Sequence, residues 1–322
     1  MAIFWLGTGV WVVSTVAQAG VGGLAALGTA LYFVAMLLLV GSATRTVTAS
    51  EVASLFCLGG FMMGLAYLGA RGFSILEPDT NAMLRKVVVP VMEETLKILP
   101  VLLLLWRGRK TRLWTLGATD VMLLAGAAGA GFAFAEDAYI RHTIGWHGTL
   151  AWLPVTEIEG SHMIAGHGIW TGLAGVTLAL AVLWRSRSRI AVLFGASGFA
   201  WAIVDHVTNN YRNARHDFLA KFLLGITNDG WLSIYLFVAG VVAVVAVDLY
   251  LVHGRMPKIG DMQSPRSASH AIGLRRLWHY LRERRKFMFL LYHAKKRGGA
   301  LRAQCVMYLT MMEQRLAVLR GV

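Results

Sequence analysis

Residues 87–106 read VVVPVMEETLKILPVLLLLW, and this stretch decides the class of fold. Its length matches the roughly 20 residues that a helix needs to cross a bilayer core of about 30 Å. Yet it carries Glu93, Glu94 and Lys97 near its middle. An acidic side chain at the centre of a membrane costs roughly 2.5 to 3.5 kcal/mol. The stretch therefore predicts a membrane-spanning helix whose charged residues need an explanation of their own.

Apolar stretches of similar length recur along the first 250 positions of the 322-residue chain. Hydrophobic residues make up 57% of the sequence and charged residues only 15%, whereas soluble proteins carry roughly 25% charged residues. We therefore predict an all-α, polytopic membrane helix bundle of about eight transmembrane helices with a basic cytoplasmic helical tail. The predicted helices lie near residues 2–19, 24–40, 52–68, 87–106, 114–134, 163–184, 190–207 and 231–250.

The first of these stretches could also be a cleaved signal. Ala17-Gln18-Ala19 resembles a signal-peptidase site, but no Lys or Arg precedes it to form the basic start of a signal peptide. We expect a retained helix. The cysteines, Cys57 and Cys305, suggest neither a disulfide framework nor a Cys-based zinc site, so that any metal is expected to use His and carboxylate ligands.

Positive charge is distributed unevenly between the two sides of the predicted helices. Most of the 31 Lys and Arg residues fall on one side: Arg45, the clusters at 107–112 and 185–189, and the basic residues after Tyr250. The positive-inside rule predicts that this side, with both termini, is cytoplasmic. The net charge of +14 then follows mostly from topology, and we predict no nucleic-acid partner. We expect a multi-pass protein of a bacterial plasma membrane.

Two domains are expected: a helix bundle at 1–252, with its catalytic core at 87–210, and a tail at 253–322. The tail begins with a linker to about residue 270 and continues as two helical patterns separated by Gly298-Gly299. The first pattern is basic and amphipathic, which is typical of a helix on the anionic cytoplasmic leaflet. A helical hairpin packed on the cytoplasmic loops explains the pattern equally well. The oligomeric state is not predicted.

The adjacent glutamates at 93 and 94 are difficult to explain by structure alone. Lys97 follows at spacings of three and four, so it can form an ion pair with one of them on the same helical face. The other carboxylate is left without a partner. Two adjacent carboxylates in a low-dielectric medium cannot both ionise cheaply, so one should hold a proton near neutral pH, as a general acid or base requires.

Three further predicted helices carry polar residues at one depth, near their outer ends. Phe132, Glu136 and Tyr139 share a face at 114–134 and just beyond it. His167 begins a pattern of small residues, and His206 shares a face with Asn210, with Asp205 as a second partner. Successive membrane helices run in opposite directions, so their polar residues are not expected to share one depth by chance. The shared depth therefore predicts a single polar pocket near the outer surface.

Other polar residues of the predicted helices fall outside this pocket. His162 lies about 140° around the helix from His167, so we expect a role in a loop or at the rim. Asp120 and Asp248 lie near the inner leaflet, where Asp248 is expected to be interfacial. The sequence suggests no role for Asp120.

The polar residues of the predicted pocket form four motifs in order along the chain. They are Glu93-Glu94-Thr-Leu-Lys97, Phe132-x-x-x-Glu136-x-x-Tyr139, His167-x7-Gly175 and His206-x-x-x-Asn210. Together, over about residues 87–210, they resemble the motifs of PrsW-type intramembrane metalloproteases, which belong with the CAAX-prenyl-protease-like membrane proteins. Tyr139 comes one residue earlier than the family spacing. The resemblance implies hydrolysis of a peptide bond in a membrane-anchored protein such as an anti-sigma factor.

The resemblance and the needs of hydrolysis together suggest roles for these residues. We expect Glu93 or Glu94, beside Lys97, to be the general base, and Asn210 to donate to the oxyanion. His167, His206 and Glu136 are the expected ligands of a divalent metal, most simply zinc, with an open position for water. A mechanism without metal, in which a Glu and a His activate water directly, stays open at this point.

Three other interpretations of the sequence compete with a glutamate-based protease. Gly195-Ala196-Ser197-Gly198 matches the G-x-S-G of rhomboid serine proteases, but His206 lies nine residues along the same helix, about 13 Å from Ser197. Buried Glu, Asp, His and Lys residues also occur in proton- or cation-coupled transporters. A membrane protein that only binds or chaperones a partner is the third. Transport would show as ion flux without cleavage, and binding would show neither.

Overall fold

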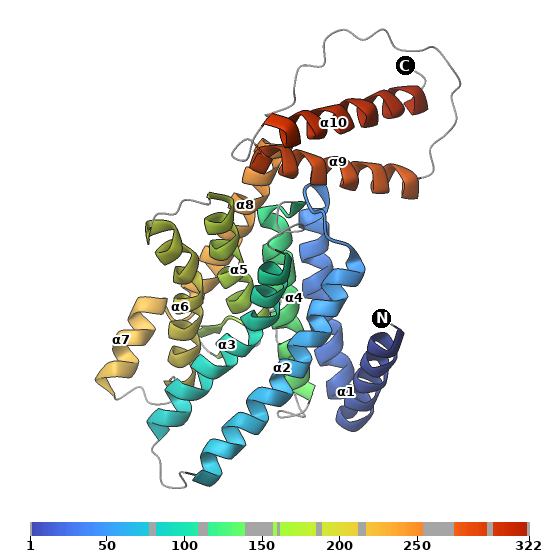
Figure 1. Cartoon of the computed structure of the whole chain (residues 1–322). Coiled ribbons are helices and arrows are strands. Elements are labelled where there is room, and N and C mark those ends of the chain that lie inside the picture. Colours follow the sequence, from blue (N-terminus) through green and yellow to red (C-terminus); the bar gives the residue numbers. More distant parts are fainter. Residues whose placement is uncertain are drawn as a thin grey trace.

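The structure is a computed structural model that describes residues 2–76, 82–108, 115–138, 157–159, 162–184, 189–211, 217–253, 274–294 and 299–320. Its helices pack into one bundle with a helical pair across one end (Figure 1). They are α1 Ala2–Val40, η1 Gly41–Ala43, α2 Ala49–Leu76, α3 Ala82–Gly108, α4 Ala118–Glu136, α5 His167–Trp184, α6 Arg189–Tyr211, α7 Phe218–Thr227, α8 Trp231–His253, α9 Leu274–Ala294 and α10 Gly299–Arg320. The predicted all-α membrane bundle is confirmed. A small antiparallel hairpin, β1 Glu157–Glu159 and β2 His162–Ile164, was not predicted.

Five helical stretches of the described residues are long and apolar enough to cross a membrane. They are Gly20–Ala43, Ala49–Phe73, Ala118–Glu136, Ile190–Tyr211 and Phe218–Val252. The shorter apolar helix His167–Leu183 lies among them, and α3 carries three charged residues within its apolar stretch. The structure thus supports a multi-pass protein with five candidate spans. The predicted total of eight stays a prediction.

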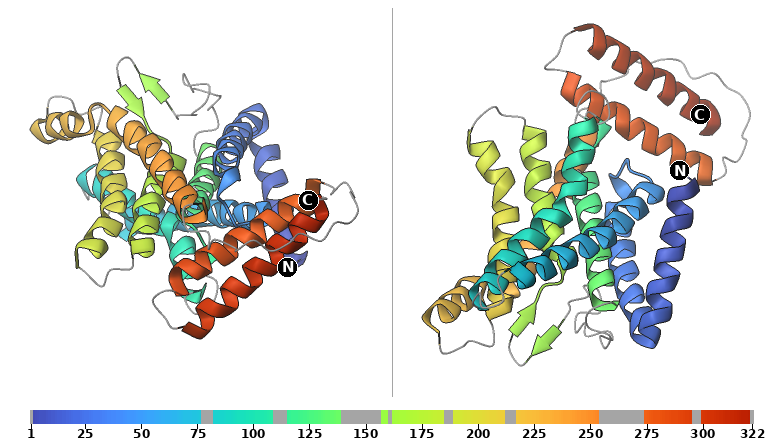
Figure 2. Two further views of the ribbon diagram at one scale, coloured as in Figure 1. Left: turned by 90° about the horizontal axis from the view of Figure 1, so that it is seen from above. Right: turned by 60° about the horizontal axis from the view of Figure 1, so that its bottom comes forward.

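The first two predicted helices form a single element that bends sharply. α1 runs from Ala2 to Val40, but Gly20 has φ 59° and ψ −136°, a conformation that only glycine adopts without strain. The chain reverses there, and its two legs lie side by side (Figures 1 and 2). The predicted break between residues 19 and 24 therefore falls at this bend.

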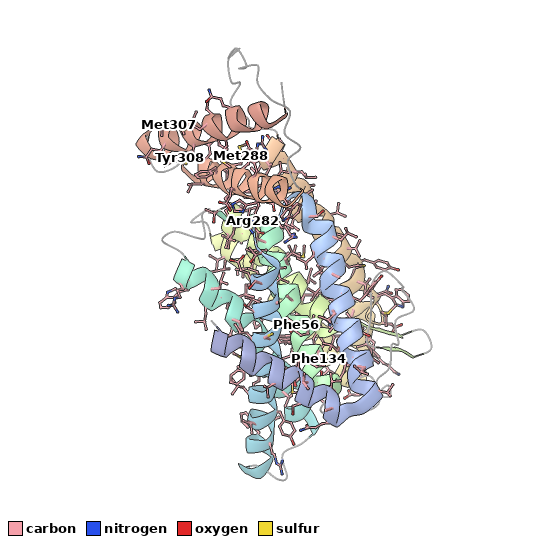
Figure 3. All side chains as sticks on the ribbon, turned by 90° about the vertical axis from the view of Figure 1, so that its right-hand side faces the viewer. Phe56, Phe134, Arg282, Met288, Met307 and Tyr308 are labelled. Carbon is pink, nitrogen blue, oxygen red and sulfur yellow. The ribbon has the colours of Figure 1, made fainter. Side chains whose placement is uncertain are left out.

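α4 is the central helix of the bundle, and small residues explain how its neighbours pack around it. Seventeen of its residues are buried, most of them Ala or Gly. A Cβ on Gly131 would overlap the backbone of Phe56 in α2, and one on Gly129 would overlap the carbonyl oxygen of His167 in α5. Phe56 also stacks on Phe134 at 6.0 Å (Figure 3). Close backbone contact through glycine thus brings α2 and the start of α5 against α4.

The end of the bundle that holds the start of α5 is tied to the turn between α7 and α8. Met163 of β2 donates its backbone N–H to the Asp229 carbonyl at 2.8 Å. Asn228, Asp229 and Gly230 all have positive φ, and a Cβ on Gly230 would overlap the Met163 carbonyl oxygen. The strand that leads into His167 is therefore paired with β1 and is also bonded to the turn between α7 and α8.

At the other end of the bundle, two buried aspartates join the loops and helix ends. Asp120 accepts hydrogen bonds from the backbone N–H groups of Thr46, Val47 and Gly117, at 2.6 to 2.9 Å, and from the Thr46 hydroxyl at 2.7 Å. Asp248 accepts from the N–H groups of Ala118 and Thr119 at the start of α4, at 3.0 and 2.7 Å. The sequence suggested that Asp248 is interfacial, but in the structure it is fully buried. Both carboxylates therefore have structural roles.

α9 packs across this same end and α10 pairs with α9 (Figure 2). Arg285 donates to the carbonyls of Ser42 and Arg45 at 2.8 and 3.2 Å, and Trp278 lies between the guanidinium groups of Arg45 and Arg285. Phe289 is completely buried. These contacts are the kind expected of a hairpin packed on the cytoplasmic loops. Binding of the tail to anionic lipid stays a prediction.

Candidate active site

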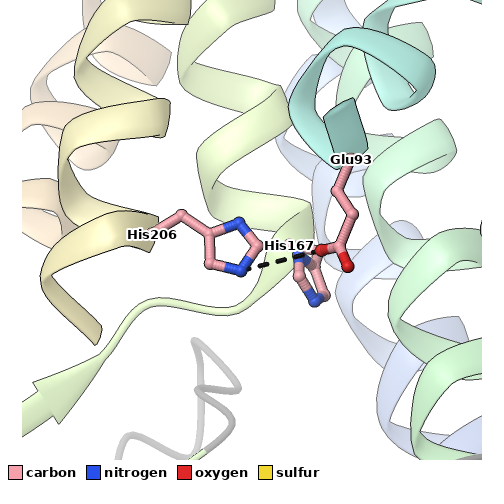
Figure 4. Close-up of side chains that lie close together, drawn as sticks. All are labelled: Glu93, His167 and His206. Atoms are coloured by element: carbon pink, nitrogen blue, oxygen red, sulfur yellow. Dashed lines mark ion pairs between the residues drawn. The ribbon is translucent and has the colours of Figure 1, made fainter. Parts of the chain in front are cut away.

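Four helices contribute to one polar cluster at the end of the bundle that carries the strands. α3 supplies Glu93, Glu94 and Lys97, and α4 ends on Glu136. α5 begins with His167, and α6 brings in His206, five residues before its end at Tyr211. Figure 4 shows Glu93 and the two imidazoles pointing into the same space between these helices. The structure thus brings these charged side chains into contact with one another, as the sequence predicted for a pocket.

Lys97 occupies the centre of the cluster and is completely buried. Its ammonium group pairs with a carboxylate oxygen of Glu94, and its Nζ lies 2.6 Å from Nδ1 of His167. The rings of Phe132 and Trp170 lie 4.9 and 5.5 Å from the same nitrogen. The lysine therefore offsets the charge of Glu94 and links α3 to α5.

His206 lies between the two glutamates and uses its two nitrogens differently. Nδ1 is 2.8 Å from Oε1 of Glu94, a normal hydrogen bond, whereas Nε2 is 3.7 Å from Oε2 of Glu93. Glu94 accordingly accepts from both Lys97 and His206, and its side chain is only 1% exposed. The side chain of Glu93 is 15% exposed. Of the adjacent pair, Glu94 anchors its neighbours and Glu93 is the more exposed.

His167 has partners at both ring nitrogens. Nε2 is hydrogen-bonded to a carboxylate oxygen of Glu136, and Nδ1 faces the Lys97 ammonium. An ammonium can only donate, so Nδ1 accepts and the Nε2 proton is directed at Glu136. Glu136 is 15% exposed at its side chain, like Glu93. The second and third predicted motifs therefore meet through this contact.

The buried indole ring of Trp170 packs against both imidazoles. The indole of Trp170 stacks on His206 with centroids 4.5 Å apart and planes 16° from parallel, and it meets His167 edge-on at 5.1 Å. Its Nε1 donates to Oδ2 of Asp205 at 2.6 Å, and Ser233 of α8 donates to the same oxygen at 2.6 Å. The position of the His206 ring is therefore linked to α8 through Trp170.

Three side chains of the cluster could together hold a metal ion. One donor atom from each of Glu93, His167 and His206 lies within 4.8 Å of the other two. Two imidazoles and a carboxylate are a common catalytic zinc set, and Glu94 behind Nδ1 of His206 provides the outer carboxylate that often orients such a ligand. The residues fit a divalent metal. Binding through His167 requires either Lys97 or Glu136 to release its nitrogen.

The other predicted residues are placed as follows. Asn210 is half-buried one turn beyond His206, and among the contacts of the described residues none joins it to the cluster. Tyr139 and the side chain of His162 lie outside the described residues. Ser197 is exposed and donates to the Phe194 carbonyl of its own helix at 2.7 Å, which offers no support for a serine nucleophile. Gly175 packs against Ala125 of α4, as expected of a small residue.

The sequence did not single out Trp170, and it predicted the role of Asp205 only in part. Trp170 follows His167 by three positions and so shares its helical face, but an aromatic residue at this spacing is typical of any buried helix. Asp205 was expected to be a second partner near His206. The structure links it to Trp170 and Ser233 instead.

Comparison with known proteins gives one finding. The family model described as PrsW family intramembrane metalloprotease matches residues 48–247, which includes all four motifs and extends from α2 into α8. Curated proteins and solved structures gave no match. With its cluster of glutamate, lysine and histidine side chains inside the matched region, the chain belongs to the PrsW family of intramembrane metalloproteases.

Proposed function

We propose that this enzyme hydrolyses a peptide bond of a membrane-anchored protein, such as an anti-sigma factor, at the cluster formed by Glu93, Glu94, Lys97, Glu136, His167 and His206. The observation that carries the proposal is the mutual approach, within 4.8 Å, of donor atoms of Glu93, His167 and His206. The excess of basic residues at the opposite end favours an extracytoplasmic site and cytoplasmic termini.

We assign Glu93, His167 and His206 as the residues that hold the metal, with zinc as the expected ion. This differs from the sequence prediction, which placed Glu136 in the metal set and gave the role of base to Glu93 or Glu94. Glu93 faces Nε2 of His206, whereas Glu136 is bonded to His167 and is not part of the three-residue group. The chemistry that a bound divalent metal supplies is Lewis acidity and a more acidic water.

Glu136 then becomes the carboxylate that moves protons. Its side chain is partly exposed beside His167, so it can accept a proton from water as the water oxygen bonds to the substrate carbonyl carbon. When the C–N bond breaks, the same proton passes to the leaving nitrogen, and Glu136 returns to its ionised form. Glu94 and Lys97 keep the two imidazoles in place throughout. Asn210, one turn beyond His206, is the proposed donor to the oxyanion.

Two matched variants test these assignments. Glu93→Gln should lose both bound metal and cleavage, because a neutral amide is a weak metal ligand. Glu136→Gln should keep the metal and lose cleavage by roughly 10²- to 10⁴-fold, the usual contribution of a general base. Metal content of the purified proteins and cleavage of a single-span reporter in proteoliposomes are the measurements.

The opposite pattern, with metal lost only in Glu136→Gln, would restore the roles predicted from sequence. The cluster would not be the metal site if metal content were unchanged in all four variants Glu93→Gln, Glu136→Gln, His167→Gln and His206→Gln. Full cleavage by Glu93→Gln, Glu94→Gln and His167→Gln together would show that the reaction takes place elsewhere.

A further inference from the structure

An apolar groove runs along the outside of the bundle between α3 and α6. Its volume is about 560 Å³, α3 and α6 form its walls and α5 its floor. α3 crosses the bundle obliquely, so it meets α6 at the end that holds the polar cluster and diverges from it toward the other end (Figure 1). The groove fills the space that opens between the two helices.

Small residues form much of the floor and one wall. α5 and α6 lie close together at Gly198, which has no side chain. A Cβ at this position would come within 2.5 and 2.6 Å of Thr177 Oγ1 and the Leu173 carbonyl oxygen. Ala174 and Ala181 of α5, with Gly195 and Ala196 of α6, then line the groove. Small residues on a membrane helix allow the backbone of another helix to approach closely.

One end of the groove points toward the candidate active site. Thr95, on its wall, is the residue after Glu94. Ala174 and Phe199, which also line it, lie seven residues from His167 and His206 respectively, or about 10 Å along each helix. All three helices that form the groove thus lead from it into the polar cluster. A chain lying in the groove would therefore have one end about 10 Å from the two imidazoles and would have to extend beyond the groove to reach them.

The lining is uncharged and offers almost no hydrogen-bonding group. Among the described residues of the lining, Thr95 alone has a polar side chain, and its hydroxyl donates to the Val91 carbonyl within α3 at 2.7 Å. An occupant must therefore be apolar and must satisfy its own backbone, as a membrane-spanning helix does. A flexible lipid chain would gain little from the small residues, whereas a helix would.

We propose that this groove binds the membrane-spanning helix of the protein substrate and directs the end of that helix to the polar cluster. The inference rests on the proposed function, since it assumes that the substrate is membrane-anchored. Its test can be made without hydrolysis.

The test uses photocrosslinking to a synthetic helix. A photoreactive benzophenone amino acid replaces Val192, which lines the groove and is 69% exposed, or its neighbour Leu193, which is 70% exposed and lies outside it. The probe is a biotinylated, Lys-flanked Leu/Ala peptide of single-span length in phosphatidylcholine vesicles. Position 192 should give about tenfold more adduct than position 193, as expected if helix contact contributes 1 to 2 kcal/mol.

Two further variants separate the groove from the general surface. Ala196→Trp fills the groove and should reduce the adduct at position 192, whereas Ser197→Trp, exposed but outside the groove, should not. Should the protein with the label at 192 fail to fold, Leu102 in the groove and Leu103 outside it provide the same pair on α3.

Equal adducts at 192 and 193, or an adduct that is insensitive to Ala196→Trp, would mean that lipid fills the groove and would overturn the inference. If the adduct forms in the groove but the protein cleaves no reporter, the groove binds a helix and the proposed proteolytic function is wrong.

Discussion

Both ends of the bundle bury ionisable side chains, but the two sets are used differently. At one end the carboxylate of Asp120 accepts four hydrogen bonds, three of them from backbone N–H groups, and Asp248 caps the start of α4. At the other end Glu93 faces a histidine nitrogen at 3.7 Å and keeps 15% of its side chain exposed. Among the described residues, this second end is where a carboxylate and two imidazoles lie close enough together to bind a metal ion.

The comparison shows that burial of charge does not by itself identify a site in a membrane helix. A buried carboxylate saturated by backbone donors stabilises the fold, because leaving any of those donors unpaired would be costly. A buried cluster of carboxylate, ammonium and imidazole groups whose ligand atoms lie within a few ångströms of one another can bind an ion and react. Variants at the two ends should therefore separate stability from activity.

The largest effect is expected from Lys97→Met. The change removes the partner of Glu94 and of His167 Nδ1 while keeping a side chain of similar length. Cleavage should fall roughly 100-fold or more, as when one preorganised donor is removed from an active site. Stability should fall by about 3 to 5 kcal/mol, because a buried carboxylate loses its ion pair. Reporter cleavage and thermal unfolding in detergent measure the two effects.

Lys86→Met is the matched control on the same helix. Lys86 lies 4.7 Å from the ring of Tyr211, and its loss should cost only about 0.5 to 1 kcal/mol and leave cleavage unchanged. Equal effects of the two changes would show that Lys97 has no special role in the cluster.

At the other end, Asp120→Ala should affect stability alone. It leaves the N–H groups of Thr46, Val47 and Gly117 without their acceptor, so we expect a loss of about 3 kcal/mol or more in unfolding free energy. Asp120→Asn retains an acceptor oxygen and should lose less. In the fraction that stays folded, kcat for the reporter should equal that of the parent protein. A folded Asp120→Ala variant without activity would contradict the division between the two ends.

A smaller effect, confined to the site, is expected from Asp205→Ala. The carboxylate holds Trp170, whose ring stacks on His206, and its loss should let that imidazole turn. We expect metal affinity to fall about tenfold, in the range for residues that orient a metal ligand, with kcat lowered and KM little changed. Asp205→Asn, which keeps an acceptor for Trp170, should restore most of the affinity. Equal loss in both variants would point to general disruption of α6.

The site was more predictable from the sequence than the details of the fold. Charged residues in apolar helices are costly, so Glu93, Glu94 and Lys97 were conspicuous, and the depth argument brought them to His167 and His206. The exchange of roles proposed for Glu93 and Glu136 depends on side-chain direction across helices. No spacing along a single helix contains that information.

Other features needed tertiary contacts to be interpreted. Asp120 had no apparent role because its donors come from residues 46 and 47, more than 70 positions away. The bend in α1 depends on the positive φ of Gly20, and the two legs of the helix look like separate spans to any analysis of hydropathy. Trp170 resembles an ordinary buried aromatic residue until its neighbours are known.

The smallest expected effect concerns the tail. Arg285→Ala removes two hydrogen bonds to the carbonyls of Ser42 and Arg45 and one of the two cations beside Trp278. Charged hydrogen bonds of this kind contribute about 1.5 to 3 kcal/mol, of which part is offset by the cost of burying the guanidinium group, since Arg285 is only 8% exposed. We expect a loss of about 1 kcal/mol, with cleavage unchanged.

Lys286→Ala is the control for this change. Lys286 pairs with Glu283, one turn away on the same helix, at a partly exposed site, so its loss should cost less than about 0.5 kcal/mol. Limited proteolysis gives an independent measurement, since α9 released from the bundle should be cut faster in Arg285→Ala than in Lys286→Ala. If the two variants are cut at the same rate, Arg285 does not hold α9 in place. The attachment of the tail would then depend on Phe289, which is completely buried and adjoins Gly117 at the start of α4, beside Asp248. That result would make apolar packing, rather than charge, the link between the tail and the structural end of the bundle.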